Sequence, residues 1–105
     1  MNDDKRGDQR FPIQRGVEIR LLSGAIIYGV TRDLSFGGSF IECDTTVLKG
    51  GEECYLSVML ENDEKSAEIF SDIRYYTETG VGCHFLTFDS GYYQFLTNYS
   101  LATAL

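Results

Sequence analysis

Two arginines, Arg6 and Arg10, lie four positions apart in the N-terminal stretch KRGDQR. A guanidinium group is always charged, donates hydrogen bonds in a planar fork that fits phosphate or the acceptor edge of guanine, and stacks on flat rings. In an extended segment the two side chains fall on the same side and span about 13 Å. The pair could therefore hold an anionic ligand of nucleotide size.

A second polar cluster follows in the stretch RDLSFGGSF. The carboxylate of Asp33 can accept hydrogen bonds, and Ser35 adds a hydroxyl. Gly37 and Gly38 let the backbone turn where a side chain would obstruct a ligand. Taken alone, the arginines are more typical of solvated charges near a terminus, and Asp33 with Ser35 is more typical of a turn that shapes a loop.

The elements that must position these clusters begin with a hairpin over residues 16–31. Apolar and polar side chains alternate before and after Ser23-Gly24, which predicts two antiparallel strands with the turn at these two residues. Paired positions then sum to about 47. This register places Arg15 opposite Arg32 and brings Arg10 near Gly37, so both clusters should lie at one end of the sheet.

Four further strands are predicted at 40–43, 54–60, 67–76 and 81–86, at the spacing typical of an all-β sandwich or barrel. Asp89 or Ser90 can cap a helix that covers one side or mouth of the barrel. Its expected apolar face is Tyr92, Phe95, Leu96 and Tyr99. We expect one domain, with a mobile arm at 1–12, a barrel at 16–88 and the helix at 89–105.

In this order and spacing, the two clusters resemble the signature of the PilZ domain, RxxxR followed by [D/N]xSxxG after the first hairpin. The stretch GVGCHFLTFD is similar to the last barrel strand and its exit. The resemblance covers nearly the whole chain and implies a six-stranded antiparallel β-barrel that binds the bacterial second messenger cyclic di-GMP. By resemblance the ligand contacts are Arg6, Arg10, Asp33, Ser35 and Gly38, with Gly37 beside them.

The residue before RxxxR influences how many ligands a PilZ domain holds, and an arginine there is associated with an intercalated pair. Here that residue is Lys5, which keeps the charge but lacks the planar fork. A stacked pair brings four phosphate charges close to one lysine and two arginines. We therefore expect two ligands per chain.

Other function classes are disfavoured. A formal net charge of −7 argues against a protein that tracks long nucleic acid. His84 and Cys83 are strand neighbours that point to opposite faces, so they cannot form a catalytic dyad. The cysteines show no metal-ligand spacing and are expected to be core residues. Acidic pairs such as Glu52-Glu53 read as solvated surface. We expect no enzyme, no metal and no cofactor.

The expected setting is cytoplasmic, since neither a secretory signal nor a membrane-spanning run is present in the sequence. Because the chain ends soon after the predicted fold, we expect an adaptor that signals to a separate effector protein. The alternative is a domain of the same fold that works by protein contact without nucleotide. Arg32 could add a phosphate contact or be a solvated charge, and Arg15 competes with Arg6 as the partner of Arg10.

Overall fold

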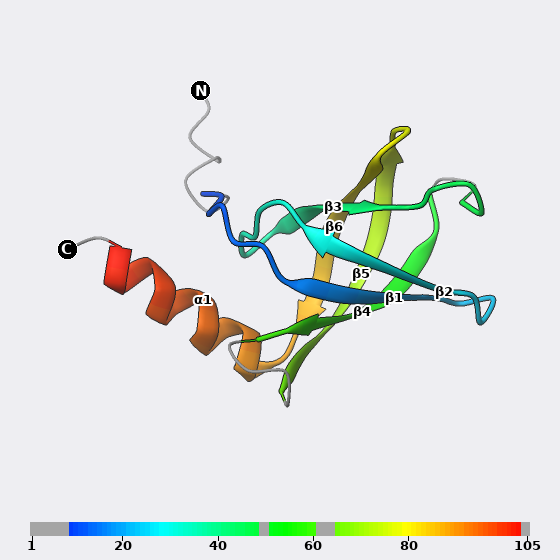
Figure 1. Ribbon diagram of the computed structural model, residues 1–105. Coiled ribbons are helices and arrows are strands. Elements are labelled where there is room, and N and C mark those ends of the chain that lie inside the picture. Colours follow the sequence, from blue (N-terminus) through cyan, green and yellow to red (C-terminus); the bar gives the residue numbers. More distant parts are fainter. Residues whose placement is uncertain (1–8, 49–50, 61–64, 104–105) are drawn as a thin grey trace, which may run out of the picture.

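The computed structural model describes residues 9–48, 51–60 and 65–103. The predicted barrel and helix are confirmed, with six strands followed by one helix among these residues (Figure 1). The elements are β1 (Gly16–Leu21), β2 (Ile26–Thr31), β3 (Gly38–Cys43), β4 (Glu53–Met59), β5 (Ser66–Tyr76), β6 (Gly80–Phe88) and α1 (Ser90–Thr103). Lys5 and Arg6, with the rest of residues 1–8 of the predicted arm, lie outside the described residues.

The strands close into an antiparallel barrel in the order β1-β2-β3-β6-β5-β4. Closure pairs each strand on both sides and leaves no free sheet edge. Alternate side chains fill the interior, as Val17, Ile19 and Leu21 of β1 illustrate, with exposures of 6% or less. The outward-facing side chains of the same strands are therefore free to build a surface site.

The register of the first hairpin differs by one residue from the prediction. Gly16 pairs with Val30, so paired positions sum to 46. The connection is the three-residue turn 22–24 rather than the two-residue turn Ser23-Gly24, and Gly24 takes the left-handed conformation with φ of 101°. Three-residue hairpin loops commonly end on such a residue, and glycine adopts it without steric cost.

This shift moves the predicted neighbours at the end of the hairpin. The Thr31 N–H donates to the carbonyl of Arg15, where the prediction had Arg32. Beyond β1, Phe11 forms an isolated antiparallel bridge with Leu34. Arg10, next to this bridge, donates a hydrogen bond to Asp33, and the N-terminal side of the hairpin meets the glycine loop as expected.

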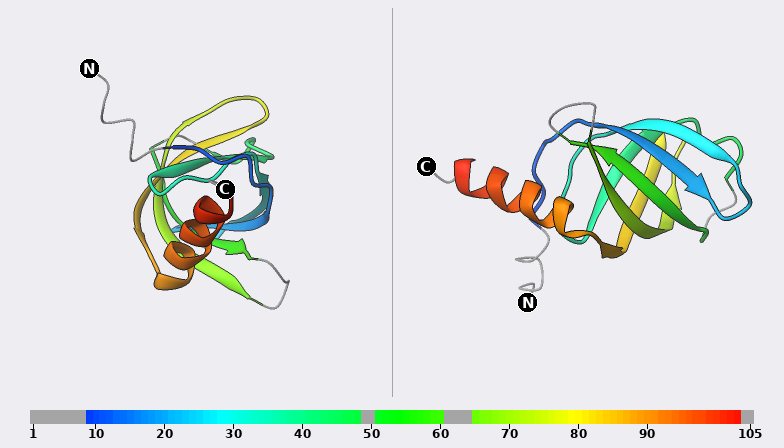
Figure 2. Two further views of the ribbon diagram at one scale, coloured as in Figure 1. Left: turned by 90° about the vertical axis from the view of Figure 1, so that its left-hand side faces the viewer. Right: turned by 90° about the horizontal axis from the view of Figure 1, so that it is seen from below.

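Helix α1 begins after Asp89, whose side chain accepts a hydrogen bond from the Tyr92 N–H at 3.0 Å in the usual manner of a helix cap. Tyr92 and the other predicted apolar residues, Phe95 and Leu96, are buried, and Tyr99 packs edge-on against Phe11 with ring centroids 5.5 Å apart. Figure 2 shows the helix at one end of the barrel, with its C-terminal part running away from the strands. No helix in the described part of the chain is long and apolar enough to span a bilayer.

Candidate functional site

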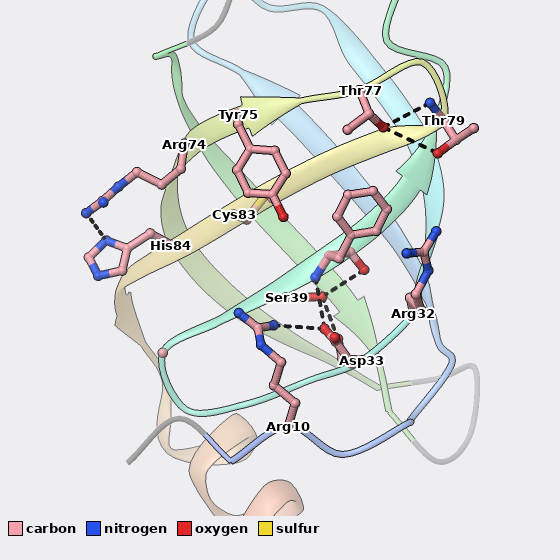
Figure 3. A pocket seen from close by; sticks show the side chains of 13 residues that line it. Arg10, Arg32, Asp33, Ser39, Arg74, Tyr75, Thr77, Thr79, Cys83 and His84 are labelled. Carbon is pink, nitrogen blue, oxygen red and sulfur yellow. Dashed lines mark hydrogen bonds and ion pairs between the residues drawn. The ribbon is translucent and has the colours of Figure 1, made fainter. Parts of the chain in front are cut away.

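An open pocket with a volume of about 750 Å³ lies over the outer side of β3, β6 and β5 and extends to the segment before β1 (Figure 3). Charged and aromatic side chains dominate its lining, chiefly Arg10, Arg32, Asp33, Arg74, Tyr75 and His84. The chain as a whole has a net charge of −7. Three guanidinium groups line one hollow, and the phosphates of an anionic ligand could compete for them with the carboxylates of Asp33, Glu42 and Asp72.

The predicted meeting of the two sequence clusters occurs at the pocket rim. Arg10 donates from Nη1 to Oδ1 of Asp33 at 3.0 Å, across 23 positions of sequence. The same Asp33 oxygen accepts the Phe40 N–H at 3.0 Å, and the Ser39 hydroxyl donates to the Asp33 carbonyl at 2.6 Å. Asp33 is thus fixed from two sides by β3, and it in turn holds Arg10 over the pocket.

The Arg10 to Asp33 ion pair is open to solvent, with side-chain exposures of 51% and 22%. Pairs of this kind contribute only about 0–1 kcal/mol to folding stability, because water screens the charges and ordering the side chains costs entropy. The fold therefore does not depend on this contact. Both groups remain available to a ligand that can offer them better partners.

Ser35 does not line the pocket, although the sequence singled it out as a contact. It is buried, and its hydroxyl accepts from the N–H groups of Gly37 and Gly38 and lies 3.0 Å from the Gly38 carbonyl, to which it can donate. Such a hydroxyl-closed turn fixes the path of the loop. Gly37 is a lining residue of the pocket, so Ser35 acts on the site through the backbone it holds.

Gly38 is required by the close packing of two strands and not by a turn. It lies in β3 opposite His84, it is not among the described glycines with positive φ, and it is absent from the pocket lining. A Cβ added at this position would collide with the backbone carbonyl oxygen of Cys83. The close approach of β3 to β6 beneath the pocket therefore depends on the missing side chain.

We predict that Gly38→Ala destabilises the barrel by about 1–3 kcal/mol, because backbone atoms must shift to admit the methyl group. For a domain of this size each kcal/mol lowers the melting temperature by about 4–8 °C. Gly16→Ala is the matched control, since its Cβ would meet only Met59 at an ordinary 3.8 Å. Thermal unfolding followed by circular dichroism distinguishes them. Equal melting temperatures of the two variants would contradict this account of Gly38.

Arg32 and Arg15, which the sequence analysis considered as further candidates, have different surroundings. Arg32 lines the pocket, pairs with Glu42 at 3.0 Å and lies over the Phe40 ring, 4.3 Å from its centroid. Arg15 is not a lining residue. Its guanidinium lies 5.4 Å from the centroid of the Phe95 ring and donates to the Gln14 carbonyl. Arg15 therefore belongs to the contact between the barrel and α1, and Arg32 to the pocket.

Sequence reasoning missed the far wall of the pocket, which β5 and β6 provide. Arg74 donates from Nη2 toward His84 Nδ1 at 3.0 Å and from Nε to Asp72 at 3.2 Å. Tyr75 lies next to Arg74 and also lines the pocket (Figure 3). The available signal was the sequence RYYTETG, a cation and aromatics before a turn, which also suits an ordinary strand end.

The Cys83 to His84 pair behaves as predicted, with neighbours on opposite faces. Cys83 is buried inside the barrel, and its hydrogen bond with Cys54, together with burial, raises the pKa of its thiol. A thiol in that environment stays protonated and is a poor nucleophile. His84 is turned outward to Arg74. No group of three potential metal ligands occurs among the described residues.

The loop beneath the site is tied to the helix. The hydroxyl of Tyr92 in α1 donates to the Ser35 carbonyl at 2.5 Å. Burial, and secondly the negative charge of Asp33, raise the pKa of Tyr92, so the phenol remains a neutral donor. Phe36 of the same loop packs against Tyr93, with ring centroids 5.7 Å apart. The loop that holds Asp33 is therefore continuous with the packing of α1.

Comparison with known proteins gives a family match and matches among solved structures. A family profile described as "PilZ domain" matches residues 4–102. Among solved structures, the crystal structure of the PilZ domain of CeSA from a cellulose synthesizing bacterium is similar with a TM-score of 0.67 and 25% sequence identity, and the match covers 75% of this chain and 81% of that one. No curated protein matches the sequence.

Proposed function

This chain belongs to the PilZ domain family, whose members are typically non-catalytic receptors for cyclic di-GMP, and we propose that it binds this ligand in the pocket beside Arg10 and Asp33. The observation that carries the proposal is the ion pair between these two residues at 3.0 Å. It joins the arginine motif to the aspartate motif at the rim of a hollow lined by three arginines.

The chemistry of the ligand fits these groups. The Arg10 fork can meet the O6 and N7 acceptors of one guanine or a phosphate oxygen. Asp33, fixed by the Phe40 N–H, can accept from the N1 and N2 donors of guanine. Arg6 and Lys5 would add charge from the N-terminal side, and Gly37 would let the ligand approach the backbone. Ser35 and Gly38 would act by shaping this loop.

Isothermal titration with cyclic di-GMP tests the proposal, with cyclic di-AMP as the matched control of equal charge. We expect saturable binding of cyclic di-GMP and much weaker binding of cyclic di-AMP, whose bases lack the O6 acceptor and the N2 donor. We also expect saturation at two ligands per chain. Saturation at one would overturn the stoichiometry alone, whereas absence of binding would favour a domain that works by protein contact without nucleotide.

We propose further that the ligand orders the N-terminal arm and so creates the surface that an effector protein recognises. Residues 1–9 contain one apolar side chain, Met1, among several charges, so the arm gains little from packing. A bound anion would give Arg6 and Arg10 a shared partner. Ordering would use about 1–2 kcal/mol per residue of the binding energy in backbone entropy.

Limited trypsin digestion is expected to show this ordering. Cleavage after Lys5 and Arg6 should be rapid in the free protein and slowed by saturating cyclic di-GMP, and mass spectrometry of the truncated chain measures the rate. The bond after Arg10 is expected to be cleaved slowly in both states, because Phe11 is buried and bridged to Leu34. Cleavage after Arg20, within β1, serves as the control and should be slow in both states. Equal cleavage rates of the arm with and without ligand would contradict the proposal.

A further inference from the structure

The ring of Tyr75 lies over a glycine of the neighbouring strand. Tyr75 and Gly82 are cross-strand partners, and a Cβ added to Gly82 would collide with three atoms of the Tyr75 ring. The ring of Phe40 on β3 lies beside it, with centroids 6.3 Å apart and planes at 33°. Tyr75 is nevertheless 54% exposed. The ring is supported by β6 and still presents a large surface to the pocket.

A bulge in β5 puts this ring on the pocket side. Ile73 pairs with Cys83 and Tyr75 with Gly82, so Arg74 is an extra residue without a partner of its own. In a regular strand Arg74 and Tyr75 would point to opposite faces, yet both line the pocket. Bulges are frequent beside binding sites, where they redirect a side chain.

Three planar groups, the Arg32 guanidinium and the rings of Phe40 and Tyr75, lie next to one another along the pocket. The Arg32 guanidinium lies 4.3 Å from the centroid of Phe40, and Tyr75 is the next ring. Figure 3 shows Arg10 and Asp33 on the side of the hollow opposite Tyr75, with β3 and β6 between them. An exposed aromatic ring beside arginine side chains is an arrangement on which proteins stack nucleic-acid bases.

We propose that Tyr75 is the stacking platform of this pocket, on which a purine base of the ligand lies. The inference rests on the proposed function and adds a ligand-binding residue to it. An edge contact from Arg10 or Asp33 reads the base, whereas the Tyr75 ring binds its face. Because about half of the Tyr75 side chain is exposed, this role can be separated from folding.

The first test is a titration of Tyr75→Ala with cyclic di-GMP. Loss of a stacking ring should weaken binding by about 5- to 150-fold, while Tyr75→Phe, which keeps the ring, should bind within about threefold of the parent chain. Tyr28→Ala is the control, because Tyr28 is 72% exposed on β2 and does not line the pocket. If Tyr75→Ala binds as well as Tyr28→Ala, the platform is overturned and the proposed receptor function stands.

The second test uses the fact that the chain has no tryptophan. Tyr75→Trp introduces a single tryptophan, whose emission can be excited selectively and which a stacked guanine should quench on saturation with cyclic di-GMP, whereas Tyr28→Trp should keep its fluorescence. Unchanged emission from position 75 at a ligand concentration shown by titration to saturate would overturn the platform alone. If the unaltered chain binds no cyclic di-GMP, both the platform and the proposed function are wrong.

Discussion

Arg10→Ala should weaken cyclic di-GMP binding by about 5- to 150-fold, which corresponds to the roughly 1–3 kcal/mol that a two-pronged arginine contact with guanine contributes in nucleic-acid recognition. The variant removes the one described side chain that links the arginine motif to Asp33. The melting temperature should change little, since the Arg10 to Asp33 pair is exposed to solvent.

The matched control for charge is Arg20→Ala. Arg20 on β1 is 45% exposed, pairs with Glu18 at 3.2 Å and is not a pocket residue. Both variants remove one positive charge, so a purely long-range attraction of the anionic ligand would weaken binding equally. Titration calorimetry of the two variants separates these cases. Equal affinities would contradict a direct contact between Arg10 and the ligand.

Tyr92→Ala is expected to destabilise the domain by about 3–5 kcal/mol, because it empties the largest fully buried side-chain volume in the described chain. A loss of that size is a large fraction of the 5–15 kcal/mol typical of a native domain. Tyr92→Phe keeps the ring and removes only the donor to the Ser35 carbonyl. That variant should cost about 1–3 kcal/mol, the penalty for a buried acceptor without a partner.

Chemical denaturation of the two Tyr92 variants measures the cost of removing the buried ring and the cost of removing the hydrogen bond. Tyr93→Ala, at the neighbouring position of α1, is the control. Tyr93 is 55% exposed, so its truncation should change the free energy of unfolding far less than truncation of Tyr92. If Tyr92→Phe is as stable as the parent chain, the hydrogen bond from the helix to the loop carries no net stabilisation. The link between α1 and the site would then rest on packing alone.

The sequence was sufficient to predict the six strands, the helix and the meeting of the two motifs, because the strands are short alternating or apolar runs and the segments between them contain glycine or polar residues. The hairpin register was wrong by one, since Ser23-Gly24 fits a two-residue or a three-residue turn equally and only the pairing of the two strands decides between them. Arg10 could still be placed near the loop. A register error of one residue changes which residue lies opposite Arg10, but it does not change the end of the hairpin at which Arg10 lies.

The far wall of the pocket could not be predicted, for a specific physical reason. Simple alternation along β5 puts Ile73 and Tyr75 on the same face, which would bury the tyrosine. The bulge at Arg74 reverses that order, and no glycine or proline within the strand marks it. The sequence feature that relates to the Tyr75 ring is Gly82 on the partner strand. Its missing side chain makes room for the ring, but in the sequence alone it is an ordinary small residue.

The most direct measurement of the central claim is an amide chemical-shift titration of the ¹⁵N-labelled protein with cyclic di-GMP. We expect the largest saturable shifts at the residues around the pocket, namely Arg10, Asp33, Gly37, Tyr75 and Gly82, and small shifts in the hairpin turn at 22–24 on another part of the surface. Saturable shifts confined to residues outside the pocket, or a spectrum unchanged by excess ligand, would contradict binding at this site.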